Sequence, residues 1–178
     1  MKQILYVLGL AILLSGVYTS CKKDSLLAMQ QNEGAMLDKY VKDNNLSSYK
    51  DPSGIYIKIE EPQGTDSIKP KFKVMLQYTI TTMNNDTVFS TEDKYGHTFE
   101  ESPFYVDIST TAIDLNPIQQ IAGMHLGLKK MHIGDRAFMV IPSEMAFKAL
   151  DYTSTLGIPR FSTLLVYVYA KSGYLYEK

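Results

Sequence analysis

Hydrophobic and polar residues alternate along two stretches in the first half of the chain. Residues 54–61 read GIYIKIEE, and residues 71–83 read KFKVMLQYTITTM. An alternation with a period of two predicts strands that are buried on one face. The residues at every second position of the longer stretch are Phe72, Val74, Leu76 and Tyr78. The run NND at 84–86 favours a hairpin turn, so residues 87–92 should form the returning strand.

The second half of the chain adds further strands and one helix. Residues 116–131, NPIQQIAGMHLGLKKM, predict a helix, because Asn116 can cap its start and Pro117 suits its first turn. Residues 143–161 read as a long loop. The strand-like stretches are residues 103–109, 135–142 and 162–171. Strands on both sides of a single helix predict an α+β domain, in which an antiparallel sheet curls around that short helix.

The N-terminus has the features of an export signal. Lys2 is followed by an unbroken apolar run, residues 4–14, which is too short for a stable membrane span and suits a signal peptide. Cys21, the only cysteine, comes shortly after this run and directly after the small residue Ser20. This arrangement resembles the lipobox of bacterial lipoproteins, although Tyr18 stands where a leucine is usual. The resemblance implies lipidation of Cys21; an ordinary secretory peptide is the alternative.

A helical period follows the signal, over residues 25–45. Its apolar face is formed by Met36, Leu37, Tyr40 and Val41. We interpret this segment as a packing or spacer helix, with a dimerisation helix as the alternative. Turn residues at 48–54 mark the start of the domain. The predicted organisation is a signal peptide at 1–20, a lipid-anchored helix and linker at 21–52, and a domain at 53–178.

The composition excludes several classes of function. A net charge of −1 over 178 residues gives no electrostatic footprint for nucleic acid. The histidines, His97, His125 and His132, lack the paired spacing of metal ligands. Gly123 and Gly127 are not followed by the lysine and hydroxyl residue of a phosphate loop. We therefore expect no cofactor, no metal and no nucleic-acid partner.

A longer pattern in the domain points to a known family. The order of strands and helix carries two motifs, IAGMHLGLKKMHIGDR at 121–136 and GIPRFSTLLVYV at 157–168. Together they resemble the FKBP family of peptidyl-prolyl cis-trans isomerases, from about Ser53 to Ala170. The resemblance implies an FKBP-like fold and catalysis of rotation about Xaa-Pro bonds.

The resemblance also implies a set of site residues. The backbone N–H of Ile121 matches the family's donor to the substrate carbonyl. The residues at the pocket positions are Tyr78, Phe89, Phe104, Ile121, Met124, Phe147 and Val166. Several positions differ from the family pattern: Met124 replaces a tryptophan, Phe147 a tyrosine and Ser90 an acid. Most of these side chains are also what the core of a half-buried sheet requires, and the pattern alone does not separate the two roles.

These observations leave two functional hypotheses. The first is a prolyl isomerase of low activity that helps exported proteins to fold. The second is a non-catalytic FKBP-like lipoprotein that binds peptides or a protein partner. In both, the expected partners are proline-containing or unfolded exported polypeptides, and the membrane through the lipid on Cys21. The expected location is the cell envelope, facing the periplasm or the cell surface.

Overall fold

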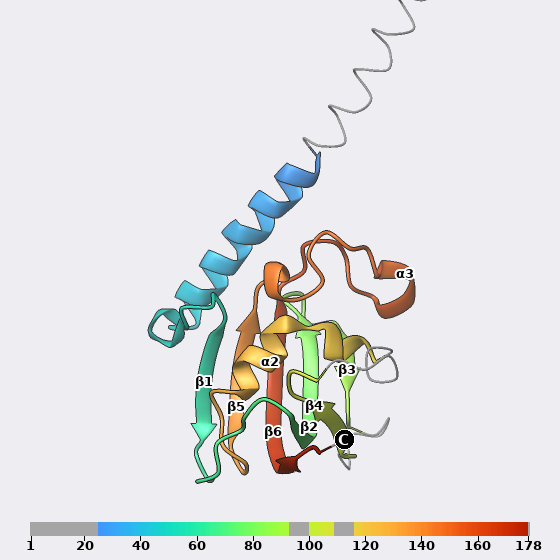
Figure 1. Ribbon diagram of the computed structural model, residues 1–178. Coiled ribbons are helices and arrows are strands. Elements are labelled where there is room, and N and C mark those ends of the chain that lie inside the picture. Colours follow the sequence, from blue (N-terminus) through green and yellow to red (C-terminus); the bar gives the residue numbers. More distant parts are fainter. Residues whose placement is uncertain (1–24, 93–99, 109–115, 178) are drawn as a thin grey trace, which may run out of the picture.

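The computed structural model describes residues 25–92, 100–108 and 116–177, and their core is an antiparallel sheet (Figure 1). The strands are β1 Tyr56–Glu61, β2 Phe72–Thr82, β3 Thr87–Ser90, β4 Ser102–Tyr105, β5 Arg136–Ile141 and β6 Leu164–Leu175. Each of the strands predicted from the hydrophobic pattern is present, with ends shifted by a few residues. The α+β class predicted from the sequence is therefore confirmed.

The sheet is built around the long strand β2. The strands of the sheet are hydrogen-bonded in the order β1-β5-β6-β2-β3. Strand β6 pairs with one edge of β2 from Phe72 to Thr82, whereas β4 pairs with the first half of the other edge and β3 with the second half. The 84–86 turn joins β2 to β3 as predicted, with Asn85 at φ 67° in the left-handed region.

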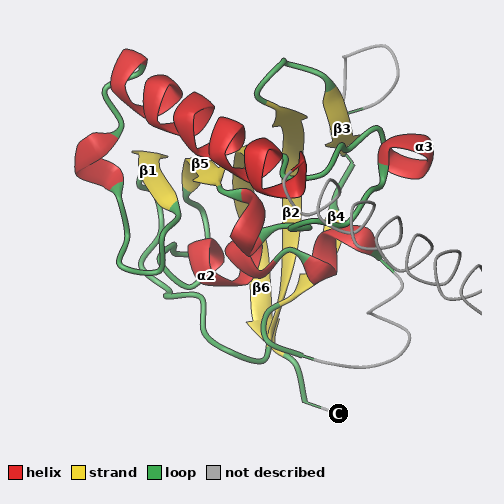
Figure 2. Ribbon diagram, turned by 90° about the horizontal axis from the view of Figure 1, so that it is seen from above, coloured by secondary structure: helices red, strands yellow, loops and turns green. Residues whose placement is uncertain are grey.

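One face of the sheet packs against the short helix α2, Ala122–Leu128 (Figure 2). Val74, Leu76, Met139 and Leu164 are fully buried on this inner face, in one cluster with residues of α2. The helix lies very close to β5: a Cβ atom on Gly127 would overlap the Met139 sulfur, and one on Gly123 would overlap Ile141. Both glycines therefore serve close packing.

The prediction of one continuous helix over residues 116–131 is wrong in one respect. A 3₁₀ turn, η2 Pro117–Gln120, precedes α2, and Ile121 between them is extended, with ψ 98°. The buried Gln119 accounts for the break, because its side-chain oxygen accepts a hydrogen bond from the Tyr105 amide at 3.3 Å. This bond connects η2 to the end of β4. Asn116 caps the turn as predicted, accepting from the Ile118 amide.

The N-terminal helix, residues 25–43, packs against the opposite, outer face of the sheet (Figure 2). Val41 and the partly buried Leu37 and Tyr40 join a second cluster with sheet residues. The sheet and linker residues of this cluster are Leu46, Tyr56, Phe138, Val140 and Leu165. Successive residues of β5 thus face opposite clusters, which explains its continuous apolar sequence.

The structure also corrects the predicted apolar face of this helix. Met36 is 40% exposed, and Glu33, one turn before Leu37, is the residue that the helix buries instead. The helix ends near the predicted stop, where Asn45 takes a left-handed φ of 56°. Within the described residues, no helix combines the length and the apolar character needed to cross a bilayer. Cys21 and the signal segment lie outside those residues.

Candidate functional site

The residues predicted to line the pocket come together although they lie on separate elements. Tyr78 comes from β2, Phe104 from β4 and Val166 from β6, while Ile121 and Met124 belong to the start of α2. These five and Phe147 are buried in the inner-face cluster, and Phe89 of β3 packs against it. The structure therefore places all seven predicted side chains in or against one apolar cluster.

This cluster is closely packed at its base and half-exposed at one edge. Six of the seven side chains are exposed by 8% or less, and only Phe89 is partly open to solvent. Met145, Tyr152 and Leu156 are also partly buried against the cluster. Strand β3 and the one-turn helix α3, Thr153–Leu156, lie near each other in Figures 1 and 2. We call the partly buried residues of this region, Phe89 of β3 with Tyr152 and Leu156 at α3, the β3–α3 edge of the cluster.

Tyr78 provides a polar group within this apolar lining. Burial raises the pKa of the Tyr78 hydroxyl above its ordinary value of 10.0, and a hydrogen bond with Ser102 opposes this only in part. The phenol therefore stays protonated at neutral pH and can act as a hydrogen-bond donor. Its backbone is fixed to Thr91, whose hydroxyl accepts from the Tyr78 amide at 2.9 Å.

The backbone N–H of Ile121 is already engaged in the structure. It donates to the Ile118 carbonyl at 3.2 Å, a long bond that closes the η2 turn. A substrate carbonyl at this position would have to share or displace that bond. The extended conformation of Ile121 leaves its amide at the junction of η2 and α2, beside the lining residue Met124.

Phe104 is held in place by a neighbouring histidine. The rings of Phe104 and His125 lie 4.8 Å apart at an angle of 54°. His125 accepts a hydrogen bond from the Asp107 amide through Nδ1, and its Nε2 donates to the Gln119 carbonyl at 2.8 Å. Both ring nitrogens are thus engaged in hydrogen bonds that position the ring. In the part of the chain that the structure describes, no group of acidic, histidine or cysteine side chains could hold a metal ion.

The loop between β5 and β6 supplies the aromatic rim. Phe147 packs edge-on against Tyr152, with ring centroids 5.1 Å apart. Sequence reasoning missed Tyr152, because loop residues follow no hydrophobic period that would single it out. Lys148, which stands where the family usually has a glycine, adopts φ 55° in the left-handed region. The backbone conformation that favours glycine is therefore retained although the residue has changed.

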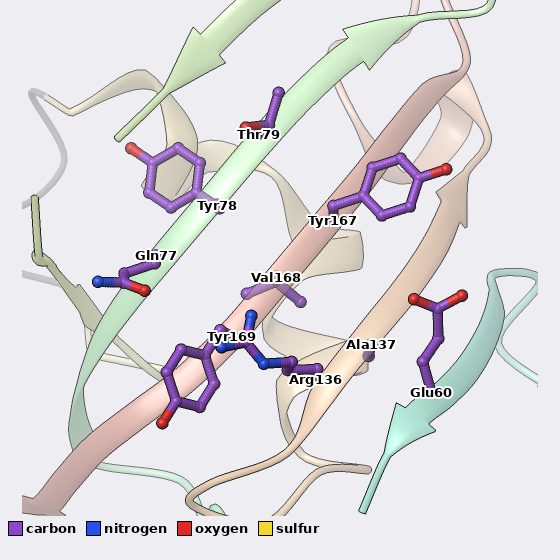
Figure 3. A pocket seen from close by; sticks show the side chains of 9 residues that line it. All are labelled: Glu60, Gln77, Tyr78, Thr79, Arg136, Ala137, Tyr167, Val168 and Tyr169. Carbon is purple, nitrogen blue, oxygen red and sulfur yellow. The ribbon is translucent and has the colours of Figure 1, made fainter. Parts of the chain in front are cut away.

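A separate hollow lies on the outer face of the sheet (Figure 3). It has a volume of about 140 Å³ and is bordered by side chains of β1, β2, β5 and β6. The guanidinium of Arg136 already covers the Tyr169 ring at 4.2 Å and pairs with Glu61. Its lining includes Tyr78, Ala137 and Val168, which belong to the inner-face cluster, so the hollow lies on the other side of the strands that carry the predicted site.

Comparisons with known proteins agree with this geometry. A sequence model of the FKBP-type peptidyl-prolyl cis-trans isomerases matches residues 64–169, which is more than half of the chain. The chain belongs to this family. The matched segment contains all seven predicted lining residues and both sequence motifs. The sequence matches no protein of curated function.

Solved structures of FKBP proteins share the fold. FkpA from Escherichia coli is 19% identical with a TM-score of 0.67; the match covers 87% of this chain but only 65% of the FkpA chain. A peptidyl-prolyl cis-trans isomerase from Pseudomonas syringae is 19% identical with a TM-score of 0.61, covering 82% and 93%. The N-terminal domain of FKBP42 from Arabidopsis thaliana is 16% identical with a TM-score of 0.56, covering 67% and 86%. At these identities the likeness establishes the fold alone.

Proposed function

We propose that this chain is a prolyl isomerase of low turnover that acts on exported polypeptides at the cell envelope. The observation that supports this most directly is the assembly of the lining residues. Side chains from four strands, from α2 and from the β5–β6 loop lie in or against one apolar cluster, whose partly exposed members Phe89, Tyr152 and Leu156 form the β3–α3 edge. A prolyl ring is an apolar ligand of suitable character for that edge.

The chemistry requires neither a nucleophile nor a metal. Rotation about a peptide bond crosses a barrier of about 18–20 kcal/mol, and for Xaa-Pro it takes roughly 10–100 s without help. The planar amide is charge-separated and is stabilised by water, so an apolar site that excludes water favours the twisted form. Ile121 N–H would hold the carbonyl, and the lining would hold the ring. The rate should be low, because that N–H is shared with Ile118.

A non-catalytic peptide-binding domain is the second candidate, and the altered lining favours it. Met124 replaces a rigid indole with a flexible chain, and Phe147 cannot donate a hydrogen bond. Such a site keeps its apolar character but loses groups that act on the twisted amide. It would bind prolyl segments of unfolded chains without accelerating their rotation.

A prolyl-isomerisation assay separates the two candidates. The test protein begins at residue 22, so it keeps every described residue but lacks the signal and the cysteine. We expect it to accelerate cis-trans exchange of an Ala-Leu-Pro-Phe peptide measurably above the uncatalysed rate, and we expect an apolar residue before proline to be preferred over an acidic one. Binding of the same peptide without acceleration would establish the binding domain instead.

The lipid anchor gives a separate prediction. Cys21 should be acylated and should hold the protein in the membrane fraction, because it is the sole cysteine and follows the signal segment. In a Cys21→Ala variant we expect the protein to remain uncleaved or to appear in the soluble fraction. The measurement is fractionation of cells with metabolic labelling by a fatty acid. Wild-type protein without label, or a variant with unchanged partition and processing, would contradict lipidation.

A further inference from the structure

The N-terminal helix carries one buried carboxylate, that of Glu33. The residue is only 7% exposed and lies in the stripe of the helix that faces the domain. Its Oε1 accepts hydrogen bonds from the Ser143 amide at 2.9 Å and from the Thr163 hydroxyl at 2.6 Å. Its Oε2 accepts from the Ser143 hydroxyl at 2.9 Å. Both partners are themselves almost completely buried.

These two partners stand at the two ends of the loop that contributes to the site. Ser143 comes shortly after Ile141, the last residue of β5, and Thr163 directly precedes Leu164, the first residue of β6. The Ile141–Leu164 pair is the last rung of the β5–β6 ladder. Glu33 therefore connects the two ends of the loop just beyond the sheet, by bridging Ser143 and Thr163.

Ser143 in turn fixes the position of Phe147. The Ser143 carbonyl accepts hydrogen bonds from the Ala146 amide at 2.9 Å and the Lys148 amide at 2.8 Å, the residues on either side of Phe147. The Lys148 carbonyl then accepts from the Phe161 amide at 2.9 Å, near the other end of the loop. A chain of hydrogen bonds thus leads from the N-terminal helix to the aromatic rim of the site.

A helix that only covers the sheet would not need this residue. Burying a carboxylate costs free energy that an apolar side chain at the same place would avoid, and three hydrogen bonds are needed to offset it. A second link lies one turn earlier, where the Gln30 amide donates to the Glu144 carboxylate at 2.8 Å. The polar contacts of Gln30 and of Glu33 are both made to the same loop, so the helix is joined to the loop as well as to the sheet.

We propose that Glu33 is a positioning residue: it fixes the 142–163 loop and thereby sets the affinity of the site for prolyl peptides. This inference rests on the proposed function. Loss of the contact leaves the loop ordered for only part of the time. The apparent affinity for the peptide then falls in proportion to the fraction of molecules in which the loop is ordered. Once a peptide is bound, the loop is ordered again and the rate of the bound complex changes little.

The test compares four chains that begin at residue 22: wild type, Glu33→Ala, Glu33→Gln and Asp38→Ala. Asp38→Ala is the matched control, since it removes an exposed carboxylate from the same helix. Glutamine keeps the length and an acceptor oxygen for the Ser143 amide and the Thr163 hydroxyl, and the Ser143 hydroxyl can turn to accept from its amide nitrogen. Each chain is measured by amide hydrogen exchange over residues 143–163, and by KM and kcat for an Xaa-Pro peptide.

We expect Glu33→Ala to exchange roughly tenfold faster in the loop and to raise KM about three- to tenfold with kcat within twofold. Glu33→Gln should remain close to wild type, and Asp38→Ala should be unchanged. Unchanged loop exchange in Glu33→Ala would overturn the proposal, as would faster exchange with an unchanged KM. A fall in kcat alone would also overturn it, because that result reports only a smaller folded fraction.

Two further variants keep the proposal testable if Glu33→Ala does not fold. Ser143→Ala and Thr163→Val each remove one hydroxyl donor and leave the carboxylate with the other contacts. Each should produce a smaller change in the same direction, and no change in either would overturn the proposal. If wild type neither isomerises nor binds the peptide, both the proposed function and this inference fail. If only the inference is wrong, wild type is active and Glu33→Ala has the same loop exchange and the same KM as wild type.

Discussion

Replacing Asp135 with alanine should lower the free energy of unfolding by about 3–5 kcal/mol, because three backbone donors would lose a buried charged acceptor. The carboxylate accepts from the amides of His132 at 2.7 Å, Gln63 at 3.0 Å and Gly64 at 3.2 Å. It thereby joins the turn before β5 to the segment after β1, close to the isolated β-bridge between Ser67 and His132. Urea denaturation of wild type and variant measures the difference.

The pH dependence gives an independent check on this carboxylate. Burial on its own would raise the pKa of Asp135, but hydrogen bonds from the His132, Gly64 and Gln63 amides outweigh it and hold the pKa below the ordinary 3.8. The folded protein therefore binds this proton less tightly than the unfolded chain. The contribution to stability is complete above the unfolded pKa near 3.8, and it is lost as the pH falls through the lower folded pKa.

Asp135→Asn and Glu61→Gln form a matched pair for this experiment, since each removes one carboxylate charge. Glu61 is exposed and pairs only with Arg136 on the surface, so its loss should cost between zero and about 1 kcal/mol. Asp135→Asn should cost more, and its stability should depend less on pH below about 3.8 than that of wild type. The assigned role of Asp135 would be contradicted if the two variants lost equal free energy of unfolding. It would also be contradicted if the stability of Asp135→Asn fell at acid pH as that of wild type does.

The role of Asp135 shows what the sequence could and could not predict. The motif around Gly134, Asp135 and Arg136 supports the family resemblance, yet nothing in its spacing distinguishes a catalytic acid from a structural one. The distinction comes from Gln63 and Gly64, about seventy residues earlier in the chain, whose amides meet the carboxylate only in the fold. Long-range polar contacts leave no periodic pattern, whereas strands do, since every second side chain must face the core.

The same reasoning explains where the predictions about helices went wrong. An apolar period marks Leu37, Tyr40 and Val41 of the N-terminal helix correctly, but it includes the exposed Met36 and passes over Glu33. A buried carboxylate is indistinguishable from a surface one until its partners are known. Gln119 is a similar case, because its contact with β4 breaks a helix that the local sequence would continue.

The sequence grouped the apolar residues of the candidate site as the structure does, but it did not identify all of the rim. Strand positions such as Tyr78, Phe104 and Val166 follow from alternation together with the family resemblance, and the structure places them together. Tyr152 was missed, since its importance depends on the path of a long loop that brings it against Phe147. Under the proposed function this rim would contact the substrate, so the activity is less predictable from sequence than the fold is.

Restoring the family's polar and rigid groups should raise the rate of isomerisation. In Phe147→Tyr, the new hydroxyl lies at the loop wall of the site and can donate to the twisted amide. One such bond contributes roughly 0.5–1.5 kcal/mol, or up to about tenfold in kcat/KM if it forms only in the transition state. Phe138→Tyr is the matched control: Phe138 is buried to a similar extent, 7% exposed against 5%, but lies on the outer face of the sheet.

Met124→Trp tests the rigidity of the buried end of the apolar cluster. We expect this change to raise the rate of isomerisation but to lower the stability of the fold. Met124 is completely buried, so a larger indole would overfill the cluster and lower the free energy of unfolding by about 1–3 kcal/mol. The same indole would hold a prolyl ring more firmly than a flexible thioether does. We therefore expect the double variant Met124→Trp, Phe147→Tyr to isomerise an Xaa-Pro peptide faster than wild type while unfolding at a lower urea concentration.

The decisive comparison is kcat/KM of the double variant against wild type and Phe138→Tyr, at a temperature where all three are folded. A gain in the double variant with none in Phe138→Tyr would place the reaction at the inner-face cluster. If neither wild type nor the double variant exceeds the uncatalysed rate, while both bind unfolded chains, the enzyme hypothesis fails and the chain is a peptide-binding member of the family. That outcome would indicate that the shared use of the Ile121 amide, which neither substitution alters, is what prevents catalysis.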